Sequence, residues 1–433
     1  MRKRSLLSVC IILSISLILV GCSNSSNSNN QSDNVVTLKV LSASQTEEPN
    51  GEVEREIAEE FMQQNPNIKI EFIAVPANEM NTKITTMATG GDLPDIFLNT
   101  PEYYLQYHDM GIAADLTELF SEDYFDRFYS NAIEESNVDG HQVFMPWETM
   151  PYGLLYRTDW FEEEGLKPPE TWEEALDAAR SFTKDTDNDG EVDRYGFAMI
   201  GEKNQSGAGR FIQILRSFGA AELIEQDGEW LTELDSPEAV EAFKFFTELE
   251  TKHEVVPPGI IQTGFSEAIS MMASEKAGMM LTGPHTVSMI LDQNPELEGK
   301  FGGVPVPKKA EHTTTQSLLG YSISNNSENK EEAAKYLEFL VSKENQKKWT
   351  EKTYRLPVVQ EVGEDPDIID DPVLGGYIES LNYTYPVPTV TYNSTVQNIV
   401  GEAYQSIIGG QETVEEAAKA AAEKVRQEIQ QNK

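Results

Sequence analysis

Hydrophobic positions along the chain change their period from one segment to the next. The short segment at residues 36–41 is rich in valine and leucine, which predicts a strand. In the following segment Val53, Ile57 and Phe61 recur every four residues, which predicts a helix with one buried face. Apolar and polar residues then alternate over residues 68–72, which predicts a second strand. The chain therefore starts its folded part as strand, helix, strand.

The same order continues further along. Met80, Ile84 and Met87 line a predicted helix, and residues 96–98 form a short predicted strand after it. Successive strand and helix units imply an α/β fold with mainly parallel sheets flanked by helices. Later helix starts are expected at residues with capping spacing or an N-terminal proline: Thr171 with Glu174, Ser236 with Pro237, and Thr413 with Glu416.

The first residues have the pattern of an export signal. Basic residues at positions 2–4 precede an apolar stretch at 6–20, which is too short to span a bilayer comfortably. Gly21 and Cys22 follow, and this arrangement resembles the lipobox of bacterial lipoproteins. We therefore expect residues 1–21 to be a lipoprotein signal peptide, Cys22 to be lipidated and residues 22–35 to be a flexible tether. The alternative is a chance cysteine in an ordinary secretory signal.

Composition narrows the functional class. The formal charge of −40 argues against nucleic acid as a partner, because a polyanion would be repelled. Of the two cysteines, Cys10 falls in the expected signal peptide and Cys22 is the expected lipidation site, so neither a disulfide nor a cysteine metal site is expected in the mature fold. The 433 residues suffice for two lobes, each with its own core.

Several blocks together resemble the bacterial extracellular solute-binding proteins that serve ABC sugar importers. The most specific is Gly90–Phe97, which matches a G-x-PD signature, and the Pro-Asp pair is expected to organise its own turn. Other blocks follow in the order of that family: 155–166 with 168–174, 276–284, 302–307, 320–324, 329–340 and 356–358. The resemblance is to the maltose-binding-protein-like carbohydrate branch and spans residues 36–433.

This resemblance implies a two-lobed periplasmic-binding-protein-like fold with a ligand cleft between the lobes. It places lobe 1 at residues 36–147 plus 320–373 and lobe 2 at residues 148–319 plus 374–433. It also implies a substrate-binding protein rather than an enzyme, expected to be a monomer that requires no cofactor. Its partners would be a carbohydrate, the ABC permease subunits and, through the lipid anchor, the extracellular face of the cell membrane.

Candidate ligand contacts come from two arguments. The crevice of an open sheet lies beyond the carboxyl ends of its parallel strands, which favours Glu47, Asn99 and Glu102. Sugar sites combine carboxylates or amides with aromatic rings, and Trp147 beside Glu148 offers both at the first expected crossing between the lobes. Hinge packing is the alternative role for that pair.

The remaining candidates follow from the resemblance. His285 stands where the family often has a stacking tryptophan, and its alternative roles are core packing or helix capping. Tyr321, Arg355 and Tyr392 fall in blocks that line the family's cleft, although each could serve packing alone. Tyr156 is expected in the core.

An acidic loop could hold calcium. Its carboxylates occupy positions 1, 3, 5, 7 and 9 of a loop with glycine at position 6: Asp185, Asp187, Asp189, Glu191 and Asp193. Gly196 stands at position 12, where a glutamate would close the shell, and a strand rather than a helix is expected afterwards. The alternatives are a structural calcium ion and a polar connector.

Two rival functions remain at this stage. A surface-anchored glycan-degrading enzyme would need only two carboxylates across a cleft. Its signals are weak, because the five histidines lack zinc spacing and the segment Gly264–Ala268, which approaches a nucleophile elbow, is better interpreted as a helix start. A binding protein for a non-sugar solute, such as an amino acid, peptide or polyamine, is the other alternative.

Overall fold

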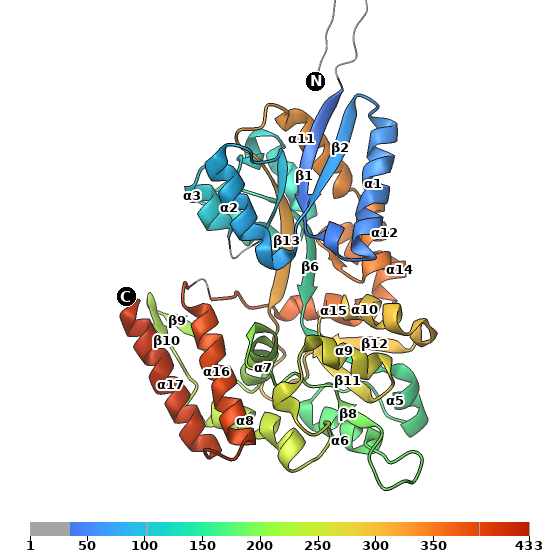
Figure 1. The fold of residues 1–433 in the computed structure, drawn as a ribbon, viewed down its shortest axis with the longest axis vertical. Coiled ribbons are helices and arrows are strands. Elements are labelled where there is room, and N and C mark those ends of the chain that lie inside the picture. Colours follow the sequence, from blue (N-terminus) through green and yellow to red (C-terminus); the bar gives the residue numbers. More distant parts are fainter. Residues whose placement is uncertain (1–34, 101–102, 389, 433) are drawn as a thin grey trace, which may run out of the picture.

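The computed structural model describes residues 35–100, 103–388 and 390–432, which form two α/β lobes stacked along the long axis of the molecule (Figure 1). The predicted signal peptide, the lipidation site at Cys22, nearly all of the tether and the candidate Glu102 lie outside the described residues. None of the described helices is long and apolar enough to cross a membrane.

The first lobe is built on a six-stranded sheet with the order β14-β6-β13-β3-β1-β2. Its strands are β1 (Val36–Ser42), β2 (Ile68–Ala74), β3 (Ile96–Asn99), β6 (Met145–Pro151), β13 (Gln316–Ile323) and β14 (Leu356–Pro357). Its helices are α1 (Asn50–Gln64), α2 (Met80–Gly90), α3 (Tyr104–Asp109), α4 (Ser130–Glu134), α11 (Lys330–Leu340), α12 (Lys343–Thr353), α13 (Gln360–Gly363) and α14 (Pro366–Ile369). A short pair, β4 (Asn137–Val138) and β5 (His141–Gln142), precedes β6.

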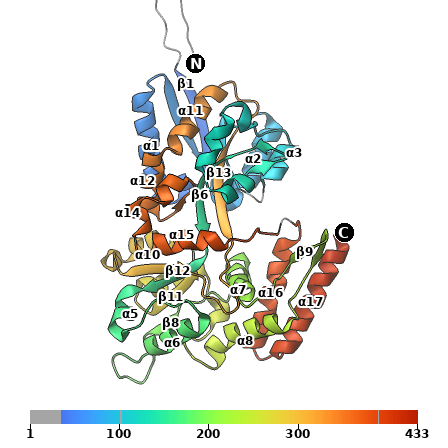
Figure 2. The same cartoon turned by 180° about the vertical axis from the view of Figure 1, so that it is seen from behind.

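The second lobe is built on a four-stranded sheet with the order β12-β7-β11-β8. Its strands are β7 (Gly153–Arg157), β8 (Tyr195–Phe197), β11 (Ala277–Thr282) and β12 (Phe301–Pro305), and a separate hairpin joins β9 (Ile224–Gln226) to β10 (Glu229–Leu231). Its helices are α5 (Thr158–Glu164), α6 (Trp172–Phe182), α7 (Gln205–Ser217), α8 (Pro237–Thr251), α9 (Phe265–Ala273), α10 (Thr286–Gln293), α15 (Leu374–Ser380), α16 (Asn393–Ile408) and α17 (Val414–Gln431). Seen from behind, α16 and α17 stand side by side at one edge of this lobe (Figure 2).

The predicted fold class is confirmed, but the strand pairing needs a correction. β1 pairs in parallel with β2 and β3, as expected. In contrast, β13 runs antiparallel to both β3 and β6, and β7 runs antiparallel to both β11 and β12. The sheets are therefore mixed rather than mainly parallel. The reason is that strands from distant parts of the chain, which no single helical crossover connects, insert between the strands of the local units.

The patterned elements form where the hydrophobic periods predict them. Val53, Ile57 and Phe61 are all buried on α1. Both predicted capping boxes are present, at Thr171 with Glu174 and at Thr413 with Glu416. The segment that resembled a nucleophile elbow begins α9, as the helix interpretation predicted.

The lobes are joined by two strands and by a helix. β6 and β13 pair with each other in the sheet of the first lobe. The chain crosses to the second lobe next to the ends of these strands, at Tyr152 and Thr314. There the hydroxyl of Thr314 accepts from the backbone amide of Tyr152 and donates to its carbonyl. The predicted lobe boundaries at 147/148 and 319/320 fall inside these two strands. Because the whole of β6 and the whole of β13 belong to the six-stranded sheet, the first lobe extends to Pro151 and resumes at Gln316.

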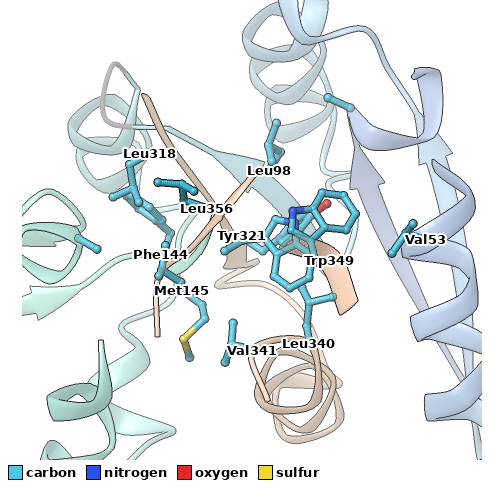
Figure 3. Close-up of a cluster of buried hydrophobic side chains, with 14 of the residues drawn as sticks. Val53, Leu98, Phe144, Met145, Leu318, Tyr321, Leu340, Val341, Trp349 and Leu356 are labelled. Carbon is cyan, nitrogen blue, oxygen red and sulfur yellow. The ribbon is translucent and has the colours of Figure 1, made fainter. Parts of the chain in front are cut away.

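Close packing fixes α15 between the lobes. α15 contacts both β12 and α14, so it joins the second lobe's sheet to the last helices of the first (Figure 1). Its approach depends on glycine, because a Cβ on Gly376 would lie 1.9 Å from the carbonyl oxygen of Gly303. The apolar core of the first lobe continues through Tyr377 to one face of the four-stranded sheet. In the first lobe this core includes Trp349 and Tyr321 (Figure 3).

Candidate solute-binding site at the lobe junction

Two of the predicted site residues, Glu47 and Glu148, accept hydrogen bonds from a third, Arg355. Arg355, directly before β14, donates from Nη1 to Glu148 Oε1 at 2.6 Å and from Nη2 to Glu47 Oε2 at 3.3 Å. Their side chains are exposed to very different extents, 13% for Arg355, 2% for Glu148 and 53% for Glu47. The cluster therefore runs from the interior of the first lobe to its surface at the end of β1.

Burial and hydrogen bonding act in opposite directions on Glu148. Burial raises the pKa of its carboxyl, while Arg355 and the indole of Trp349 act to lower it. Trp349 Nε1 donates to Glu148 Oε2 at 2.8 Å, so both carboxylate oxygens have a donor. An ionised carboxylate in such a place depends on these partners, because an unpaired buried charge is costly.

Tyr321 belongs to a second buried network next to the first. Its hydroxyl donates to the carboxylate of Glu54 on α1, which also accepts hydrogen bonds from Ser42 Oγ at 2.8 Å and Gln45 Nε2 at 2.7 Å. Burial raises the pKa of Glu54, and the nearby negative charge of Glu148 raises it further. Tyr321 is 1% exposed, so this network ties β13 to α1 beneath the surface of the junction.

On the second lobe, His285 lies at the start of α10, just after the Gly283-Pro284 turn that follows β11. Burial of the imidazole and the positive charges of Arg355 and Arg210 lower the pKa of His285 to about 3. The imidazole is therefore neutral at pH 7. Its Nδ1 has no hydrogen-bond partner among the described residues. Arg355 belongs to the first lobe and Arg210 to α7 of the second, so charges from both lobes act on the pKa of His285.

The other candidates occupy the interior. The amide of Asn99 donates to Ser322 Oγ at 2.9 Å and joins β3 to β13. Trp147 is buried against Trp349, with ring centroids 4.8 Å apart, and Tyr392 is 8% exposed within the core of the second lobe. Their role as ligand contacts stays a prediction, as does that of Glu102. Asp95 is structural, since it accepts from the amide of Lys39 and from Ser327 Oγ.

The acidic loop lies in the second lobe between α6 and β8. Carboxylate oxygens of Asp185, Asp187 and Asp193 lie within 4.8 Å of one another. Asp189 is not part of that group; its Oδ1 accepts from the amide of Glu191 at 2.8 Å. Three carboxylates at this spacing have the donor set that a hard cation such as calcium prefers.

Comparison with known proteins decides the family. Residues 44–347 match the family model described as bacterial extracellular solute-binding protein. The chain belongs to this family. The prediction of a binding protein rather than an enzyme is thereby confirmed, as is the extracellular class of the protein.

Individual relatives cover nearly the whole chain. A solute-binding protein of an ABC transporter from Thermotoga lettingae, bound with α-D-tagatose, matches with a TM-score of 0.76 and 25% identity over 91% of this chain and 100% of its own. The maltose-bound MalE3 of T. maritima matches with a TM-score of 0.74 and 26% identity over 90% and 99%. The galactooligosaccharide-binding protein of Bacillus subtilis is 23% identical over 99% of this chain and 97% of its own.

Sequence reasoning missed two groups at the junction. In the sequence Glu54 is one of several acidic residues on a predicted helix. It is buried beside Val53 and Ile57, and the spacing of hydrophobic residues does not predict the burial of a glutamate. Arg210 lies on α7 next to the buried stripe that contains Phe211. Its position near the middle of a helix does not by itself indicate that its side chain is buried.

Proposed function

We propose that this protein captures a saccharide between its two lobes and delivers it to the membrane subunits of an ABC importer. The observation that carries the proposal is the polar cluster of Glu47, Glu148 and Arg355 on the first lobe, together with the effect of the Arg355 charge on the pKa of His285 in the second lobe. Carboxylates and guanidinium groups are suited to sugar hydroxyls, which donate and accept hydrogen bonds. Relatives named for maltose and galactooligosaccharides support the same solute class.

The proposal includes anchoring at the extracellular face of the membrane. Its support is the sequence pattern alone: an export signal ending at Gly21 and a cysteine at position 22. In a bacterial host the wild-type protein is expected to fractionate with membranes and to carry a lipid. Cys22→Ala should be released in soluble form. Membrane retention of the variant without lipid would contradict a lipid anchor.

The solute class can be tested by a thermal-shift screen of the purified protein against mono- and oligosaccharides, amino acids and polyamines. Ligand at about a hundred times its dissociation constant adds roughly 2.7 kcal/mol to stability, which is a shift of several degrees. Saccharides are expected to give the shift without being cleaved. A shift with amino acids or polyamines only would show that the solute is not a saccharide. Cleavage of a glycan would show that the protein is an enzyme and not a binding protein.

Site variants then test the location. Glu47→Gln should weaken saccharide binding, because its half-exposed carboxylate lies at the junction beside Arg355. Glu71→Gln is the matched control, since Glu71 is also half-exposed and paired with a cation, Lys69, but lies on β2 within the first lobe. Equal effects of both substitutions would argue against a site at the junction.

We also propose that the acidic loop binds a structural calcium ion. Calcium should raise the melting temperature and a chelator should lower it, with Asp187→Asn abolishing the response and the exposed Asp177→Asn, on α6 outside the loop, leaving it intact. A melting temperature that does not respond to calcium would leave the loop as a polar connector.

A further inference from the structure

Arg210 is a buried cation whose hydrogen-bond partners are all uncharged. It lies on α7 with 7% of its surface exposed. Nε donates to the carbonyl of Leu281 at 2.8 Å, Nη1 donates to the carbonyl and hydroxyl of Ser206 at 2.8 and 2.7 Å, and Nη2 donates to Thr282 Oγ1 at 3.3 Å. A guanidinium has five N–H groups, so one Nη2 hydrogen is left for another acceptor.

No carboxylate of the described residues forms an ion pair with Arg210, and burial lowers the pKa of its guanidinium. Other buried arginines are paired: Arg157 with Asp159 at 2.6 Å and Arg355 with Glu148 at 2.6 Å. The contrast is informative because the chain has 73 acidic residues against 33 basic ones. A buried cation without a counter-ion destabilises the fold, and acidic side chains that could pair with it are abundant in this chain.

The surroundings of Arg210 resemble a recognition site more than a structural one. The ring centroids of Phe265 and Tyr152 lie 4.8 and 5.5 Å from its guanidinium carbon. Two polar atoms nearby, Nδ1 of His285 and the hydroxyl of Tyr377, are buried and have no hydrogen-bond partner among the described residues. Each such atom would gain a partner from a polar ligand.

Arg210 also lies close to the crossing between the two lobes. Its guanidinium carbon is 5.5 Å from the ring of Tyr152, which lies between β6 and β7 where the chain crosses from the first lobe to the second, so the unpaired guanidinium lies near the junction where the proposed solute site is. α7, α9 and α10, which supply Arg210, Phe265 and His285, all lie on the side of the second lobe that is turned toward β6 and β13 (Figure 1).

We propose that the saccharide bound at this junction carries a negatively charged group, such as a uronate carboxylate or a sulfate ester, and that Arg210 is its counter-ion. The inference rests on the proposed function and narrows its solute class. The anionic oxygen would accept the free Nη2 hydrogen, and the hydroxyl of Tyr377 could donate a second hydrogen bond. Both carboxylate and sulfate oxygens are suited to a guanidinium, so the chemistry alone does not separate them.

The test is isothermal titration of the purified protein with three probes of matched size: digalacturonate, a sulfated galactobiose and neutral galactobiose. One of the anionic probes is expected to bind about ten- to a hundred-fold more tightly than the neutral one, as for a charge-assisted hydrogen bond in a buried site. Arg210→Gln should remove that difference. The matched control is Arg426→Gln, which removes the same charge from an exposed pair on the same lobe.

The outcomes separate the two levels of the proposal. Neutral galactobiose bound as tightly as both anionic probes, or selectivity unchanged in Arg210→Gln, would overturn the anionic solute while leaving saccharide binding intact. Failure of every saccharide, here and in the thermal-shift screen, would overturn the proposed function itself. If Arg210→Gln does not fold, the selectivity of the wild type for anionic over neutral probes decides the question, together with the retention of that selectivity in Arg210→Lys.

Discussion

Removing Arg355 would leave a carboxylate stranded in the interior of the first lobe. Arg355→Met keeps a similar length and apolar stem but takes away the donor 2.6 Å from Glu148, whose side chain is 2% exposed. Only Trp349 Nε1 would still donate to that carboxylate. Breaking a buried pair from one side costs about 3 to 5 kcal/mol, and we expect a loss of unfolding free energy in this range.

The assay is denaturant unfolding of the ligand-free protein, with Arg55→Met as control. Arg55 forms a similarly short pair with Glu48, 2.7 Å, but the two side chains are 44% and 63% exposed, so its loss should cost less than about 1 kcal/mol. Glu148→Gln combined with Arg355→Met should be less destabilising than the sum of the single substitutions, by about 1 kcal/mol or more.

The pH dependence checks the cause. Burial already raises the pKa of Glu148, and loss of Arg355 should raise it further. A carboxyl with a raised pKa binds its proton more tightly in the folded state, so stability falls as pH rises through that pKa. The deficit of Arg355→Met relative to wild type should therefore shrink on acidification from pH 8 to pH 5. A deficit below about 1 kcal/mol, or one that does not change with pH, would refute the reasoning.

Three further perturbations test other parts of the structure. Tyr321→Phe removes a donor to buried Glu54 and should cost about 1.5 to 3 kcal/mol in denaturant unfolding, with the loss smaller at acidic pH where that carboxyl is protonated; an unchanged midpoint would contradict the hydrogen bond. Gly376→Ala should cost about 2 to 4 kcal/mol because its Cβ would strike the backbone of Gly303, whereas Gly90→Ala, with no heavy atom nearer than 3.9 Å, should be neutral or slightly stabilising; similar effects of the two would argue against the packing of α15. The pKa of His285 is lowered from 6.5 to about 3, so the unfolded chain gains a proton there first and the wild type should lose stability as pH falls from about 6.5; His285→Asn should show a flatter acid limb, and parallel curves would place His285 in a solvated site.

The sequence predicted the elements whose hydrophobic period is strong and local. α1 and the two capping boxes form as expected because their signals lie within a few residues of one another. The direction of β13 and β7 could not be obtained in this way, because each pairs with strands far away in the chain and nothing in a local pattern states which neighbour a strand will take.

The candidate site was predicted only in part, for the same reason. Glu47, Glu148 and Arg355 were each singled out separately, but their joint ion pairs follow from the placement of β14 beside β6. Trp147 is buried with its ring against Trp349 on α12, a contact between distant parts of the chain that no local pattern indicates. Arg210 was missed since a buried, unpaired cation breaks the rule that charged residues lie on the surface, and such exceptions are concentrated at functional sites.

The most direct test of the central claim, a solute held between the lobes, is hydrogen–deuterium exchange with and without a saturating saccharide found in the thermal-shift screen. Slower exchange is predicted on both lobes at once, around Glu47, Glu148 and Arg355 in the first and around Arg210 and His285 in the second, with no change in the hairpin of β9 and β10. Slower exchange in one lobe alone, or only at sites away from the junction, would contradict the account.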